Sequence, residues 1–80
     1  MIDYSKLRGK IKEVFDTQEA FATALGMSRT SLSLRLAGSV EWKTPETVKA
    51  CELLGIPLTE VHAYFYTLKV VETRPMEDNV

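Results

Sequence analysis

Apolar residues recur along the first half of the chain at the spacing of short amphipathic helices. The first predicted helix runs from about Asp3 to Phe15, because its apolar residues fall three or four positions apart and form one stripe: Leu7, Ile11, Val14 and Phe15. A second helix follows the N-cap Thr17 and ends at Gly26, since glycine accepts the left-handed conformation of a tight C-terminal turn. A third helix follows the N-cap Ser28 and stops at Gly38.

The second half of the chain predicts two more helices and then a segment of different character. Thr44–Glu46 offers an N-cap, a proline at the first helical position and an acid in the first turn, and the helix is expected to run to Leu54. A short fifth helix is predicted from Leu58 to about Tyr64. Residues 65–72 are rich in aromatic and β-branched side chains, which are typical of a strand. The inward residues of the fourth helix are expected to be Val48, Cys51 and Leu54.

These elements predict an all-α fold, a five-helix domain over residues 1–66 followed by a C-terminal segment over residues 67–80. That segment is expected to add a dimerisation strand at residues 66–72 and then a flexible polar tail. The chain has 80 residues, 45% of them hydrophobic and 26% charged, which is the composition of one ordinary globular domain.

The residue inventory argues against several kinds of chemistry. The lone Cys51 and the lone His62 exclude an intramolecular disulfide and argue against a zinc site, so no metal and no cofactor are expected. No nucleophile with a base and no paired carboxylates stand out, so we expect no enzyme. No run approaches the roughly 18 apolar residues of a membrane span. A cytoplasmic protein is expected.

The stretch from Gln18 to Gly38 carries the strongest functional pattern. Two short helices joined by a tight glycine turn cross steeply, as in a helix-turn-helix unit, and Ala22 is small enough to let them approach. The third helix then keeps a mostly polar outer face at its N-terminal end, the end that enters the major groove in such units. The predicted base-reading residues are Arg29, Thr30, Ser33 and Leu34.

This stretch resembles the Cro and repressor DNA-binding domains of temperate bacteriophages, most of all the small Cro-like phage regulators. The resemblance spans about residues 4–66 and rests on these residues: Gln18, Ala22, Gly26, Ser28, Leu32, Leu36, Gly38 and Leu54–Pro57. It implies the same four base-reading positions, and phosphate contacts from Gln18, Ser28 and Lys43. Arg35 departs from the family, which has an apolar or aromatic residue there. We expect it to bury its stem and reach a phosphate with its head.

The aromatic residues near the C-terminus predict a protein interface. A single helix-turn-helix unit buries little surface on DNA, so dimerisation on a two-fold site is the usual arrangement. Two chains are expected to pair through residues 66–72 or to pack reciprocally, with contacts from Phe65, Tyr66, Leu68 and Val70. The alternative is that this segment folds back across the first and fifth helices of its own chain. Trp42 is expected to anchor its loop on the core, and Cys51 to be inert core.

Three functions remain open on the sequence. The leading hypothesis is a sequence-specific regulator that binds a double-stranded DNA operator, a phage or prophage repressor of the Cro type. Its control would come from concentration and competition for operator sites, with no small-molecule effector. The net charge of −1 weighs mildly against DNA, although residues 1–43 are net basic and residues 44–80 net acidic. The alternatives are a protein-binding modulator that acts on a second repressor protein, and an antitoxin with the same fold.

Overall fold

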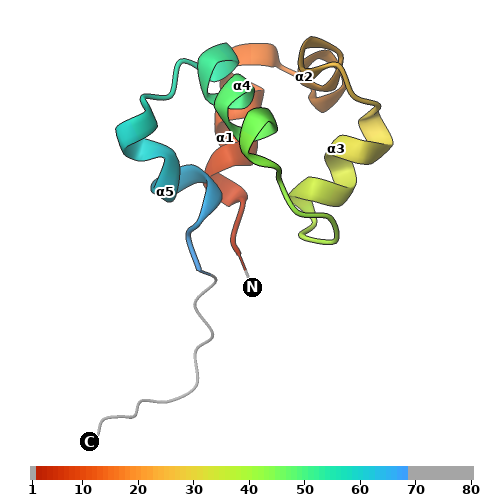
Figure 1. The fold of residues 1–80 in the computed structure, drawn as a ribbon. Helices are drawn as coiled ribbons and strands as arrows, with labels where there is room; N and C mark the ends of the chain where they lie inside the picture. Colours follow the sequence, from red (N-terminus) through yellow and green to blue (C-terminus); the bar gives the residue numbers. More distant parts are fainter. Residues whose placement is uncertain (1, 69–80) are drawn as a thin grey trace, which may run out of the picture.

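The computed structural model describes residues 2–68, which form five α-helices and a short 3₁₀ turn (Figure 1). The elements, in chain order, are α1 (Ser5–Phe15), α2 (Gln18–Leu25), α3 (Arg29–Leu36), α4 (Thr44–Leu54), the turn η1 (Leu58–Glu60) and α5 (Val61–Phe65). Residues 2–68 contain one isolated β-bridge and no β-strand. The predicted all-α class is therefore confirmed.

The helix ends are set by local hydrogen bonds, most of them at the predicted residues. The Thr17 hydroxyl accepts a bond from the Ala20 amide at 3.1 Å and caps α2. α1 begins later than predicted, because the Asp3 carboxylate accepts from the Ser5 amide at 2.8 Å and stays outside the helix. The N-cap of α4 is Lys43, one residue before the predicted Thr44, and its amide donates to Glu46 at 3.0 Å.

Helix α1 lies in the middle of the molecule and contacts α2, α4 and α5, while α3 packs against α2 (Figure 1). The largest fully buried side chains come from all of these helices: Phe21, Phe65, Leu7, Ile11, Leu32 and Cys51. The inward placement predicted for Val14 and Val48 is wrong, since these residues are 45% and 36% exposed. Each lies at the edge of its helix's inward stripe, which in α4 is centred on Ala50 and Cys51.

The two ends of the described chain lie side by side (Figure 1). Ile2 and Leu68 form an antiparallel bridge, and the Asp3 amide donates to the Thr67 carbonyl at 2.7 Å. Thr67 and Leu68 thus fold back onto residues 2–3 of their own chain, ahead of α1, whereas the alternative interpretation expected the segment to lie across the first and fifth helices. The rest of the predicted strand, including Val70, lies outside the described residues.

One predicted dimer contact is wrong. Phe65 is 1% exposed and meets the Trp42 ring edge-on, with 5.1 Å between ring centroids. This contact anchors the loop before α4 on the core, as predicted for Trp42. Tyr66 and Leu68 remain at the surface, 51% and 70% exposed. Phe65 is turned inward because α5 packs on α1, which buries one side of so short a helix.

Candidate interaction surface on the helix-turn-helix unit

Helices α2 and α3 are joined by a three-residue turn, Gly26–Ser28, and α3 packs its Leu32 and Leu36 side chains into the core. Gly26 has a φ of +81°, in the left-handed region, and its amide bonds back to the last turn of α2. The Met27 amide donates to the Ala22 carbonyl at 3.0 Å, and the Ala22 side chain is buried. A methyl group added at Gly26 would meet nothing within 4 Å. Glycine is needed there for backbone conformation and not for close helix approach.

The four predicted base-reading residues lie together on the outer side of α3. Arg29 and Thr30 are exposed in the first turn of the helix, and Ser33 is half-buried. Leu34 is 42% exposed, so it is not part of the core. Residues four apart share a face of a helix, so Arg29 with Ser33 and Thr30 with Leu34 make one continuous surface. This surface combines a cation, hydroxyl groups and one apolar side chain.

The predicted phosphate contacts are less uniform. The Ser28 hydroxyl accepts from the Ser31 amide at 3.0 Å and bonds the Ser31 hydroxyl at 3.1 Å, so its capping role occupies it. Gln18 is half-buried at the first position of α2, and Lys43 is exposed before α4. Gln18 and Lys43 therefore remain available for contacts with another molecule.

Arg35 does not reach outward as predicted. Its guanidinium binds the Glu46 carboxylate through two bonds of 2.9 Å and donates a third, of 3.1 Å, to the Ser31 carbonyl. Its side chain is only 13% exposed. Hydrogen bonds from Arg35 lower the pKa of Glu46 against the opposing effect of burial. Arg35 therefore ties α3 to α4, a role that no local pattern indicates because its partner lies eleven residues away.

Partners within the chain also occupy much of the basic charge. Residues 2–68 hold eight basic and eight acidic side chains. Besides Arg35, Lys10 and Lys12 form ion pairs in α1, and Arg8 donates to the Leu36 carbonyl at 2.9 Å. Near α2 and α3, Arg29 and Lys43 are the cations whose side chains form no ion pair within residues 2–68, although the charge of Lys43 helps to lower the pKa of Glu46. The described domain is therefore electrically balanced and offers few charges to a phosphate backbone.

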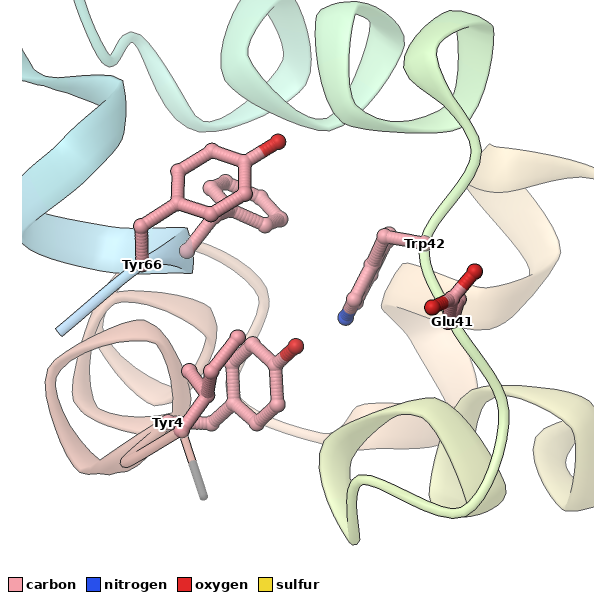
Figure 2. A pocket seen from close by; sticks show the side chains of 6 residues that line it. Tyr4, Glu41, Trp42 and Tyr66 are labelled. Atoms are coloured by element: carbon pink, nitrogen blue, oxygen red, sulfur yellow. The ribbon is translucent and has the colours of Figure 1, made fainter. Parts of the chain in front are cut away.

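A second feature, not identified from the sequence, is a pocket of about 250 Å³ on the side of the molecule where the two chain ends meet (Figure 2). It is lined by Ile2, Tyr4, Glu41, Trp42, Phe65 and Tyr66. The Trp42 indole Nε1 is buried and has no hydrogen-bond partner within the described structure. Burial, followed by the charges of Tyr66 and Glu41, raises the pKa of Tyr4. Three distant segments build this pocket, so no local sequence pattern marks it.

Other kinds of site find no support in the described part of the chain. Residues 2–68 contain no group of three His, Cys, Asp or Glu side chains placed to hold a metal ion. Burial raises the pKa of the Cys51 thiol, which lowers its reactivity. Among the described helices, none is both long and apolar enough to cross a bilayer.

Comparison with known proteins gives matches of two kinds, to a solved structure and to a family model. The chain is similar to the solution structure of the modulator of repression (MOR) of the temperate bacteriophage TP901-1 from Lactococcus lactis, with 42% identity and a TM-score of 0.73. The alignment covers 81% of this chain and 88% of that one. No curated protein matches. Residues 1–68 match the model of a family described as "Protein of unknown function (DUF739)", and this chain belongs to that family.

Proposed function

We propose that this protein is a modulator of repression, which binds a repressor protein in the bacterial cytoplasm and thereby changes the repressor's occupancy of its operator. The observation that carries this proposal is the 42% identity to a phage modulator of repression over 88% of that protein's chain. This favours the interpretation as a protein-binding modulator over that of a Cro-type repressor acting alone. The proposed role is binding, with no catalytic step.

The outer face of α3 is the proposed contact with the repressor. Leu34 leaves 42% of its surface exposed beside polar residues of the same face. Burial of a whole leucine side chain is worth about 1.5–3 kcal/mol, so covering the exposed part of Leu34 contributes on the order of 1 kcal/mol. Arg29 and Thr30 can supply hydrogen bonds around it. An apolar centre with a polar rim is the usual composition of a protein interface.

The charge balance supports a protein partner more than DNA alone. Non-specific affinity for DNA comes mainly from the counterions that are released when cationic side chains bind phosphates, so a protein with few free cations binds DNA weakly. With Arg35 bound to Glu46, Arg29 and Lys43 are the cations left for phosphates near α3.

A second candidate function, direct operator binding, is favoured by the exposure of Arg29 and Thr30 at the N-terminal end of α3.

A mobility-shift experiment separates the two functions. The DNA flanking the gene is incubated at roughly 150 mM salt, near physiological ionic strength, with this protein, with a repressor that binds this DNA, and with both. A modulator changes the shift only when the repressor is present. A shift by this protein alone at submicromolar concentration would support operator binding and contradict the modulator. Both functions would be contradicted if this protein changed the shift neither alone nor together with the repressor, and if the two proteins formed no complex in size-exclusion chromatography.

Homodimerisation is a separate proposal. Of the four residues predicted to mediate it, Tyr66 and Leu68 are exposed and Phe65 is buried in its own chain. Light scattering of the full chain across a range of concentrations tests it. A constant monomeric mass would contradict it.

A further inference from the structure

The pocket beside the chain ends holds a donor that its own chain leaves unused. The indole N–H of tryptophan only donates, and a buried donor without an acceptor costs free energy. In Figure 2 the Trp42 nitrogen lies at the end of its ring that faces Tyr4, and the Glu41 carboxylate lies on the opposite side of the pocket from Tyr66. Buried polar groups in native proteins are nearly always paired, so this one indicates an acceptor supplied from outside.

Two further hollows adjoin this pocket, and we refer to the three together as the groove. The two hollows, of about 240 and 330 Å³, each share Ile2 and Tyr4 with the pocket. One runs past Arg8 and Leu36, and the other past Gly38 and Val40, beside the C-terminal end of α3. An extended chain fits such a line of hollows better than a compact small molecule does.

We infer that this groove binds an extended segment of a partner protein, which places one aliphatic side chain in the Trp42 pocket and offers a neighbouring backbone carbonyl to the Trp42 indole N–H. The outer residues of α3 do not line this groove, so its occupant need not be a repressor.

The size and chemistry of the pocket select this occupant. Its volume of about 250 Å³ lies below the roughly 300–1,000 Å³ of pockets for drug-sized ligands and suits a single side chain. Its walls are largely apolar: Ile2, Phe65 and the rings of Tyr4, Trp42 and Tyr66. The Glu41 carboxylate disfavours an anionic acceptor, and burial of the site disfavours any charged group, as it does in raising the pKa of Tyr4. A peptide carbonyl is a neutral acceptor that always lies near a side chain.

Entry requires one wall to move. The Trp42 Nε1 atom is closed to water in this structure, so an acceptor reaches it only when a neighbouring side chain shifts. Tyr66 is the exposed wall residue, with 51% of its surface free, and it follows the last residue of α5. Rotation of an exposed side chain is fast and inexpensive. Tyr66 is therefore the side chain expected to admit the segment.

Nuclear magnetic resonance tests the inference directly, because Trp42 is the only tryptophan in the chain and gives a single indole N–H signal. The ¹⁵N-labelled full chain is titrated with N-acetyl-L-leucine N-methylamide, a capped residue with one aliphatic side chain and neutral carbonyls. We expect the Trp42 Nε1–H signal to move downfield and saturate at millimolar concentrations. The glycine analogue should leave it in place, and free N-acetyl-L-leucine, a carboxylate, should move it less.

Two variants complete the test. Tyr66→Ala removes an exposed wall of the pocket and should change the probe concentration at which the Trp42 indole signal saturates. Leu58 is 61% exposed and does not line the pocket, so Leu58→Ala should leave that concentration unchanged. An immobile indole signal, or equal movement with the leucine and glycine probes, would overturn the inference. So would a signal that moves on dilution of the protein alone, since a second copy of the chain would then be the occupant.

Discussion

The ion pair between Arg35 and Glu46 gives the sharpest test of how α3 is held in place. Replacing Arg35 with methionine keeps the aliphatic stem but removes both 2.9 Å bonds to Glu46 and the 3.1 Å bond to the Ser31 carbonyl. Hydrogen bonds to charged groups contribute about 1.5–3 kcal/mol each when buried. The two side chains retain 13% and 23% of their exposure. Water therefore compensates part of the loss, and we expect a net cost of about 2 kcal/mol.

For a domain of this size, that loss lowers the melting temperature by about 8–16 °C. The effect should depend on pH. The pKa of Glu46 is lowered in the folded state, so its contribution to stability is present above the carboxylate's ordinary pKa and disappears as the pH falls through the lowered value. The difference in the free energy of unfolding between the native protein and the variant should therefore be largest at neutral pH and become smaller in acid, where only the bond of Arg35 to the Ser31 carbonyl is left to be lost.

Urea denaturation followed by circular dichroism measures this gap, and α1 offers a matched control. Lys12 and Asp16 also pair at 3.0 Å, but their side chains are 74% and 81% exposed. Lys12→Met should thus cost less than about 1 kcal/mol. Equal losses for Lys12→Met and Arg35→Met, or a loss for Arg35→Met that persists unchanged in acid, would refute the role assigned to the buried pair.

Single side chains elsewhere in the domain lead to three more expected outcomes. Leu34→Asp should weaken repressor binding by about tenfold or more in calorimetry without lowering the melting temperature, since it adds a charge to a surface and not to the core; unchanged affinity would remove α3 from the proposed interface. Gly26→Ala should destabilise the fold by about 1 kcal/mol, because an alanine at a φ of +81° is strained, whereas Gly9→Ala, inside α1 with open space around it, should stabilise it by about 0.5–1 kcal/mol. A change in the same direction for both glycine variants in urea denaturation would contradict the strain assigned to position 26. Cys51 should react with a thiol reagent at the rate of global unfolding, since it is 1% exposed and its pKa is raised; rapid labelling of the native protein would contradict its place in the core.

Features that depend on neighbours within about four residues could be predicted from the sequence. The caps at Thr17 and Ser28 bond to amides three positions away, so the beginnings of α2 and α3 can be found by inspection. The left-handed turn at Gly26 is likewise a property of one residue. Such local signals were enough to predict the all-α class and the exposed residues at the start of α3.

Features that join distant parts of the chain emerged only when the helices were packed together. Arg35 meets Glu46 across two helices, and Phe65 turns inward onto Trp42, so a predicted phosphate contact and a predicted dimer contact became internal ones. Leu68 pairs with Ile2 at the opposite end of the described chain. Periodicity states which side of a helix is apolar, but not which partner covers it, because burial depends on how the helices pack.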